Sequence, residues 1–180
     1  MRDLTTFMLQ QIPVLVTASI TELAEAGLSH REAERTLREA TGRLSRTMAT
    51  HFRSGGEAGS KAPVSLEGLV DIEESIWAPQ FGIKGVVDAT MLVRYPPTHP
   101  SAGTSAVASG ESQLGLAAVE FKSGKRYHSH AAQVALYGLL LRARYGVAPL
   151  NGLLWYSSSD DMEPAKLKPQ DIAGAASPLC

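Results

Sequence analysis

Apolar residues recur at steps of three and four positions through the first 53 residues, the spacing that places them on one face of a helix. Pro13 interrupts the first stretch, because proline removes a hydrogen bond from the interior of a helix. Gly27 ends this stretch and is a candidate for the left-handed residue that follows a helix. The pattern therefore predicts an N-terminal helical segment, which we place at residues 1–60.

The second helix of this segment is predicted to begin at Ser29, because Glu32 follows at the spacing of a capping box. The apolar positions of this helix are Ala33, Leu37, Ala40, Leu44, Met48 and Phe52. Charged residues fill the remaining positions, so we expect the helix to bury one side and to expose the other.

Beyond residue 64 the pattern changes to short apolar runs rich in β-branched residues, which predict strands. These runs cover residues 64–72, 86–94, 114–122 and 150–157. A helix predicted at His128–Tyr145 and closed by Gly146 lies between the last two runs, which indicates a strand–helix–strand unit with a right-handed crossover. The order predicts an α/β fold in which a mixed central sheet is flanked by helices.

Two further segments offer little apolar surface to bury. Residues 96–113 are rich in proline, serine, alanine and glycine, and they predict a flexible insertion between two strands. Residues 161–180 predict a poorly structured tail. The core is therefore placed at residues 61–160.

Composition limits the classes of function. A chain of 180 residues suits one domain, and its net charge of −1 means that any contact with nucleic acid needs a local basic cluster. The one cysteine, Cys180, cannot form a disulfide or a cysteine metal site from this chain alone. No apolar run approaches the roughly 20 residues of a membrane span, so we expect no membrane partner. The phosphate loop of a helicase, GxxxxGKS/T, does not occur.

Candidate chemistry lies at the end of the run at residues 114–122. Residues two apart in a strand share a face, so Glu120 and Lys122 should emerge together, with Phe121 turned into the core. Hairpin pairing of the neighbouring strands would bring Asp88 beside Glu120. Two carboxylates suit Mg²⁺, and a nearby lysine suits phosphodiester hydrolysis. The spacing alone also fits a surface salt bridge at a strand end.

Three blocks carry a more specific signal: DIEESIWAPQFGIKGVVDAT, AAVEFKSGK and AAQVALYGLLL. Their order and content resemble the nuclease domain of the eukaryotic DNA replication helicase/nucleases, in the RecB-like branch of the PD-(D/E)XK superfamily. The likeness covers roughly residues 64–157, with weaker helical similarity before it. The resemblance implies a restriction-endonuclease-like core and a metal-dependent nuclease that cleaves single-stranded or flap DNA in replication and repair.

The resemblance also implies roles for single residues. Asp88 and Glu120 would bind Mg²⁺ or Mn²⁺, with Lys122 as the catalytic lysine. Gln133 and Tyr137, which lie four residues apart and so share a helix face, would orient the lysine, water or DNA. Glu74 would lie near the metal, although a purely structural role is an equal alternative.

Basic and aromatic residues flank this centre. Those expected to contact DNA phosphates are Lys84, Lys125, Arg126 and His128, with His130 nearby; solvent-facing charge is the alternative for each. Trp77, Phe81 and Tyr127 could stack on unpaired bases. Core packing is nevertheless the favoured expectation for Trp77 and Phe81, and also for Trp155.

Two parts of the family pattern are missing. The helix that brings a metal-binding histidine is not found, and His30 and His51 are expected to be exposed helix residues. The family also holds a 4Fe–4S cluster through four cysteines, and Cys180 alone does not supply them. The resemblance further implies a helicase domain as partner and a location in the nucleus, with the mitochondrion as an additional candidate. The alternative function is a DNA-binding fragment or module with little activity alone.

Overall fold

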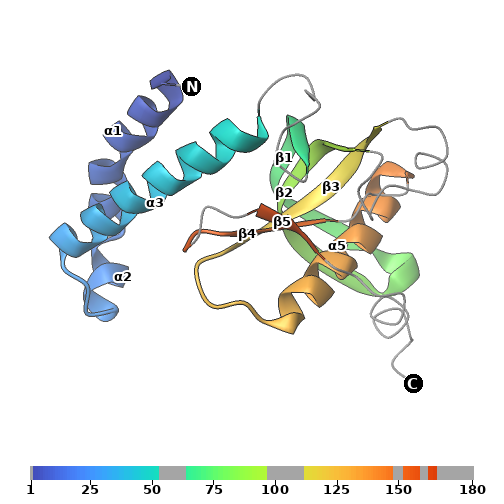
Figure 1. The fold of residues 1–180 in the computed structure, drawn as a ribbon. Helices are drawn as coiled ribbons and strands as arrows, with labels where there is room; N and C mark the ends of the chain where they lie inside the picture. The colour runs from blue at the N-terminus through green and yellow to red at the C-terminus, as the bar shows by residue number, and fades with distance from the viewer. Residues whose placement is uncertain (1, 53–63, 97–111, 148–151, 159–161, 166–180) are drawn as a thin grey trace.

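The computed structural model describes residues 2–52, 64–96, 112–147, 152–158 and 162–165. The expected connection after the helical segment, most of the insertion at residues 96–113, and Cys180 lie outside the described residues. Within them, a five-stranded mixed sheet is flanked by helices and preceded by a helical segment, which confirms the predicted fold class (Figure 1).

The sheet has the strand order β1-β2-β3-β4-β5. Its strands are β1 (Ser65–Ala78), β2 (Ile83–Tyr95), β3 (Gln113–Lys122), β4 (Leu153–Tyr156) and β5 (Met162–Pro164). All neighbours are antiparallel except β3 and β4, which are parallel and joined through α5 (His128–Tyr145). The predicted hairpin and the strand–helix–strand unit are therefore both present. β5 occupies part of the segment that was predicted to be a poorly structured tail.

The helical segment consists of α1 (Arg2–Ala18), α2 (Ile20–Glu25) and α3 (His30–His51). The prediction that Pro13 interrupts the first helix is wrong, because Pro13 lies within α1 and the break falls at Ser19. Ile12 and Val16, on either side of Pro13, are buried in a cluster with Ala33 of α3. This packing keeps the helix continuous where the backbone preference alone would end it.

The capping box at the start of α3 is confirmed. The Ser29 hydroxyl accepts a hydrogen bond from the Glu32 backbone N–H at 3.2 Å, and the Ser29 backbone N–H donates to the Glu32 carboxylate at 3.0 Å. His30 is exposed as expected. The expectation for His51 is wrong: its ring is buried, and Nδ1 lies 3.1 Å from the Val64 carbonyl oxygen at the entry to β1.

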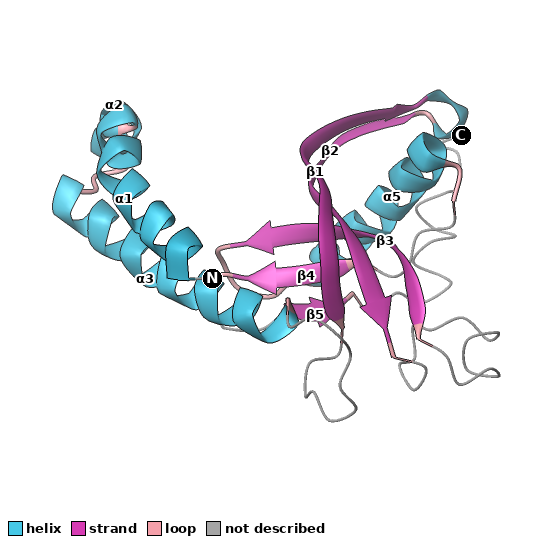
Figure 2. Cartoon of the chain, turned by 90° about the horizontal axis from the view of Figure 1, so that it is seen from above, coloured by secondary structure: helices cyan, strands magenta, loops and turns pink. Residues whose placement is uncertain are grey.

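Two hydrophobic clusters lie on opposite faces of the sheet. The larger one unites β1 to β5 around Tyr95, Val119 and Leu153, with Leu44 and Met48 of α3 packed against it. The second joins the outer half of the β1–β2 hairpin to α5. As Figure 2 shows, this half of the hairpin bends away from the rest of the sheet toward α5. The site described below lies at this bend. No helix among the described residues is long and apolar enough to cross a membrane.

Replacing Gly152 with alanine should destabilise this fold. An added Cβ would lie 2.1 Å from Val134 Cγ1 of α5 and 2.9 Å from the Ala118 carbonyl oxygen of β3. Relieving such overlaps typically costs about 1–3 kcal/mol. Urea unfolding should therefore show a lower midpoint for Gly152→Ala. Gly68→Ala is the control, because its added Cβ meets nothing within 4 Å. An unchanged midpoint for Gly152→Ala would contradict the close approach of β4 to α5.

Candidate active site

The proposed reaction centre begins at the end of β3. Glu120 and Lys122 lie on the same side of the strand, as the alternation of side chains predicted, and the Lys122 ammonium forms an ion pair with the Glu120 carboxylate. The pair is deep for a strand end, since the Glu120 side chain is only 3% exposed and that of Lys122 is 23% exposed. This is not the surface salt bridge that spacing alone allowed.

Helix α5 extends the ion pair into a chain of hydrogen bonds. Lys122 Nζ donates to Gln133 Oε1 at 3.0 Å, and Gln133 Nε2 donates to the Tyr137 hydroxyl oxygen at 2.8 Å. Gln133 and Tyr137 are one helical turn apart, which is why both reach the same point. The structure thus brings four of the five residues predicted to be catalytic, namely Glu120, Lys122, Gln133 and Tyr137, into one network.

Asp88 joins this network through the backbone of β3. Its Oδ2 accepts a hydrogen bond from the Phe121 backbone N–H at 2.8 Å. The β2–β3 pairing runs from Tyr95↔Gln113 to Ala89↔Val119, and Asp88 is the next residue of β2. The Asp88 carboxylate therefore accepts its hydrogen bond at the point where the two strands stop pairing. This places the carboxylate at the junction between β2 and β3.

The bend in the hairpin occurs at the level of Asp88. Val87 packs in the cluster under α5, whereas Ala89 packs in the cluster on the other face. Residues two apart in a regular strand share a face, so β2 changes face at this point. On the neighbouring strand, Glu73 lies between the register pairs Ile72↔Ala89 and Glu74↔Val87 and has φ of 50°. That left-handed backbone is uncommon for a residue other than glycine and is often found at functional sites.

The donor set of this centre suits a hard divalent cation. Glu120 Oε2 is buried and has no hydrogen-bond partner among the described residues, a costly state that a cation would relieve. Carboxylate oxygens are the ligands that Mg²⁺ prefers, usually one or two together with water. Within the described part of the chain, no group of three or more acidic, histidine or cysteine side chains gathers as a metal site. Asp88 and Glu120 are the two carboxylates at the β2–β3 junction that could serve as ligands.

The pKa of the Tyr137 phenol is shifted by its surroundings, which include the carboxylates of Glu120 and Asp88. Burial raises its pKa to about 12, and the negative charges of Glu120 and Asp88 add to the effect, while the hydrogen bond from Gln133 opposes it. The hydroxyl therefore remains protonated through the physiological range and can hold Gln133 in place.

Glu74 is buried in a different set of contacts. Its Oε2 accepts from the Thr90 hydroxyl at 2.7 Å, its Oε1 accepts from the Tyr145 hydroxyl at 2.9 Å, and Arg144 Nε lies 3.6 Å from Oε1. Both oxygens are engaged away from Asp88 and Glu120. These contacts favour the structural alternative for Glu74, in which it ties the bend of the hairpin to the end of α5.

The predicted DNA-contacting residues differ in their surroundings. Lys84 and Lys125 are exposed, on β2 and after β3 respectively. Arg126 forms an ion pair with Glu163 at 2.9 Å, and its guanidinium lies 4.9 Å from the centre of the Tyr156 ring. The side chain of His128 lies outside the described residues.

Sequence reasoning missed an aromatic cluster beside these cations. His130 Nδ1 lies 3.0 Å from the Tyr156 hydroxyl, and its ring meets Tyr127 edge-on with centroids 5.5 Å apart. Tyr156 and Glu163 are brought there by β4 and β5. No local signal marks Tyr156, because its neighbours in the cluster come from distant parts of the sequence.

The aromatic expectations are corrected in part. Trp155 is buried as predicted. Core packing is wrong for Trp77 and Phe81, which are both exposed at the end of the β1–β2 hairpin, next to the 3-10 turn η1 (Pro79–Phe81). Nothing among the described elements covers that outer face of the hairpin, so these rings have no core to enter.

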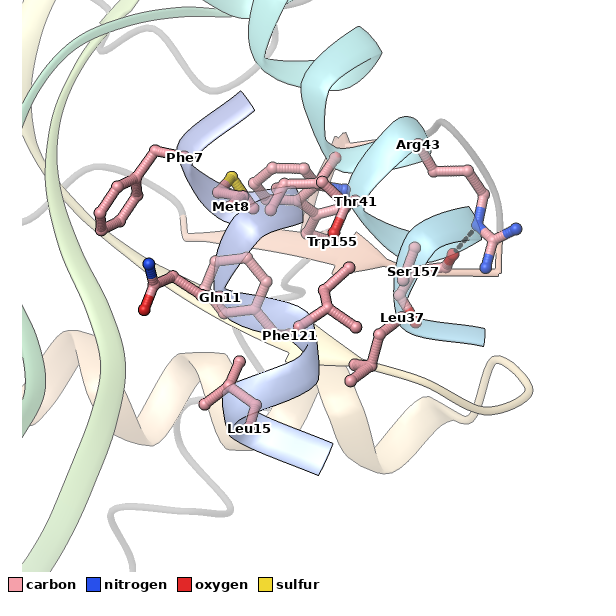
Figure 3. A pocket seen from close by; sticks show the side chains of 13 residues that line it. Phe7, Met8, Gln11, Leu15, Leu37, Thr41, Arg43, Phe121, Trp155 and Ser157 are labelled. Atoms are coloured by element: carbon pink, nitrogen blue, oxygen red, sulfur yellow. Dashed lines mark hydrogen bonds between the residues drawn. The ribbon is translucent and has the colours of Figure 1, made fainter. Parts of the chain in front are cut away.

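Phe121 also departs from expectation. Its ring is 45% exposed rather than turned into the core, and it packs on Trp155 with ring centroids 5.1 Å apart. Figure 3 shows both rings lining a mainly apolar pocket of about 350 Å³ under α1 and α3. Neighbouring side chains of a strand point to opposite faces, and Phe121 lies between Glu120 and Lys122. The pocket therefore lies on the opposite side of β3 from those two residues.

Comparison with known proteins gives the family. A sequence model described as DNA replication factor Dna2 matches residues 3–93, beginning in the helical segment where the blocks above gave only a weaker likeness. The DNA replication ATP-dependent helicase/nuclease JHS1 of Arabidopsis thaliana is 34% identical over 125 residues, 67% of this chain and 9% of that protein. The helicase/nuclease dna2 of Schizosaccharomyces pombe is 38% identical over 52% of this chain and 6% of its own length. Human DNA2 is 36% identical over 53% of this chain and 8% of its own length.

The fold, the site and these relatives together define a nuclease-related α/β domain of the replication proteins. The chain belongs to the DNA replication factor Dna2 family. It spans no more than about a tenth of the length of the curated relatives given above.

The ion pair should reveal itself in a double-mutant cycle. Lys122→Met should cost about 3 kcal/mol of stability, because it leaves the Glu120 carboxylate buried without its counter-ion. Glu120→Gln should cost less, since Lys122 is partly exposed and can turn toward water. The double variant should recover much of the Lys122→Met loss in urea unfolding. Strictly additive single losses would show that the two charges do not interact.

Tyr137 should weaken the fold at alkaline pH. Its pKa is raised from 10.0 to about 12 by folding, so its contribution is fully present below pH 10 and is lost as the pH rises through about 12. The free energy of unfolding of Tyr137→Phe should therefore fall less steeply than that of the wild type across this interval. The other tyrosines with a raised pKa, Tyr95, Tyr145 and Tyr156, are common to both proteins, so the difference isolates Tyr137. Parallel pH profiles would contradict the assignment.

Proposed function

We propose that this chain is a metal-dependent deoxyribonuclease core that cleaves phosphodiester bonds in single-stranded or flap DNA during replication and repair. Membership of a family whose named relatives are replication helicase/nucleases supports the substrate and the setting. The observation that carries the proposal is the buried Glu120 carboxylate, with one oxygen paired to Lys122 and the other without a hydrogen-bond partner in the part of the chain that the structure describes.

Asp88 and Glu120 are the residues that would hold Mg²⁺ or Mn²⁺ at the junction of β2 and β3. A divalent cation there supplies a Lewis acid that lowers the pKa of water and neutralises charge on a phosphate. The Asp88–Phe121 hydrogen bond ties one carboxylate to the strand that carries the other, which supports a site shared by the two.

Lys122 is the residue that acts on the phosphate or on the attacking water. Its ammonium is held from one side by Glu120 and from the other by Gln133, which Tyr137 holds in turn. A cation fixed in this way needs no reorganisation as negative charge develops on the phosphate. Gln133 and Tyr137 are positioning residues in this scheme.

Phosphates on either side of the cleaved bond would be held by Lys84, Lys125, Arg126 and His128. The 4Fe–4S cluster and the helicase domain implied by the family resemblance need residues that this sequence does not contain. The cluster needs cysteines besides Cys180, and a helicase domain needs a phosphate loop. Replication as the setting supports a location in the nucleus, with mitochondria as a further candidate location.

A DNA-binding module with little activity alone is the second candidate. The chain spans no more than about a tenth of the relatives described above, and the histidine helix implied by the family resemblance is not found in its sequence. In this case the same residues would hold DNA, and cleavage would need the rest of the protein.

The test is cleavage of end-labelled single-stranded DNA by the purified chain with Mg²⁺, with Mn²⁺ or with chelator. Asp88→Asn and Lys122→Met should each lower the metal-dependent rate roughly 100-fold or more, because each removes a charge placed for the transition state. Asp71→Asn, which changes an exposed carboxylate of β1, is the matched control and should cleave at the wild-type rate.

The remaining outcomes separate the candidates. Equal cleavage by wild type, Asp88→Asn and Lys122→Met would refute the site. Binding of DNA without cleavage in any metal would support the module. Circular dichroism of each variant should match the wild type, so that a lost rate is not a lost fold.

A further inference from the structure

The outer face of the β1–β2 hairpin carries an exposed aromatic residue beside an exposed cation. Trp77 is 73% exposed, the most exposed of the large apolar side chains in the described residues. Its register partner on β2 is Lys84, so the two are direct cross-strand neighbours. Phe81, at the turn that joins the strands, adds a second exposed ring.

The opposite face of the same hairpin is buried against α5. Ile76, Ala78 and Val87 are buried against α5, and a Cβ added at Gly85 would lie 2.9 Å from Leu140 of that helix. The alternation of a strand then leaves every second side chain outward. Trp77 and Lys84 are outward for this reason, and not because the hairpin is loosely packed.

This face leads along β2 toward the candidate active site. Lys84 and Val86 are exposed and lie four and two residues before Asp88 on β2, where the strand changes face. At roughly 3.3 Å per residue along a strand, Lys84 lies within about 13 Å of Asp88. A strand of nucleic acid bound on Trp77 and Lys84 would therefore be a few nucleotides from the bend, and it would have to cross the bend to reach the centre on the α5 side.

We propose that Trp77 and Lys84 form a stacking platform for single-stranded DNA, with a base on the indole and a phosphate on the ammonium. The proposal rests on the nuclease function proposed above and extends it to the path of the substrate. Exposed aromatic rings interleaved with cations are the usual means of binding unpaired bases without sequence preference. A duplex hides the faces of its bases, so this platform selects single strands.

The two tryptophans of the chain allow a direct test. Trp155 is 5% exposed and Trp77 is 73% exposed, so stacking should quench the fluorescence of Trp77 alone. Oligothymidylate is added to the full chain in chelator, where nothing is cleaved. Trp155→Phe should keep the quenching and Trp77→Phe should lose it. A duplex of the same length should quench less. No quenching of the Trp155→Phe protein would overturn the proposal.

Affinity gives an independent measure. Trp77→Ala should weaken binding of a labelled oligothymidylate roughly 5- to 150-fold, the range expected for the loss of one stacked base. Lys84→Gln should lower the slope of log affinity against log salt by about 0.7, as for one lost phosphate contact to a single strand. Leu114→Ala, an exposed apolar residue at the start of β3, should change neither quantity. Wild-type affinity for Trp77→Ala would overturn the platform.

The outcome is separable from that of the nuclease proposal. Asp88→Asn should retain full quenching in chelator, since it leaves the platform intact. Quenching that is assigned to Trp77, in a chain that never cleaves, would support the platform and count against activity of this chain alone. Metal-dependent cleavage with no quenching would refute the platform and leave the centre standing.

Discussion

The burial of one carboxylate at the end of β3 sets the conditions for the rest of the site. Glu120 is among the most buried charged groups of the described residues, and an unpaired carboxylate in such a place would be very costly. Lys122 compensates one oxygen, and Gln133 and Tyr137 of α5 fix the direction of that lysine. The second oxygen has no hydrogen-bond partner among the described residues. A fold that needed only stability would replace such a pair with apolar side chains, which are often as stable or more so. Its presence is therefore better explained by chemistry than by packing.

The hairpin bends at the level of Asp88. On one side of the bend β1 and β2 belong to the central sheet, and on the other they lie over α5, as Figure 2 shows. The bend has a conformational cost, seen in the positive φ of Glu73. Glu74, the next residue, is tied to Thr90 and Tyr145 by buried hydrogen bonds that hold the bent form. Glu73 and Glu74 therefore act on the proposed site indirectly, because they fix the shape of β1 opposite Asp88.

Features with local causes could be predicted from the sequence. The predicted bounds of α5 match the observed ones because Gly146 takes the left-handed conformation that ends a helix. Gln133 and Tyr137 meet because they are one helical turn apart. The shared face of Glu120 and Lys122 follows from strand alternation, although the depth of Glu120 does not. The burial of Glu120 depends on how α5 packs against the sheet, and this tertiary contact cannot be read from local sequence patterns.

The errors have the same physical origin. Pro13 remains helical because α3 packs beside it, and His51 is buried because its ring contacts the Val64 carbonyl group. Trp77 is exposed because no described element covers the outer side of the hairpin. In each case tertiary packing, or its absence, outweighs a local preference. β5 was missed for a related reason, since three residues give no period and pair only because β4 offers an edge.

The C-terminal half of α3 packs on the central sheet. The family match runs from residue 3 to residue 93, so it includes the helical segment as well as β1 and most of β2. Leu44, Met48 and Phe52 of α3 pack on the main cluster of the sheet, and Arg43 Nε donates to the Ser157 carbonyl oxygen just after β4. Phe121 of β3 and Trp155 of β4 line the pocket under these helices, on the side of the sheet away from Glu120 and Lys122. Phe121 lies between those two residues and donates its N–H to Asp88, so one residue of β3 joins the apolar pocket on one face to the proposed centre on the other.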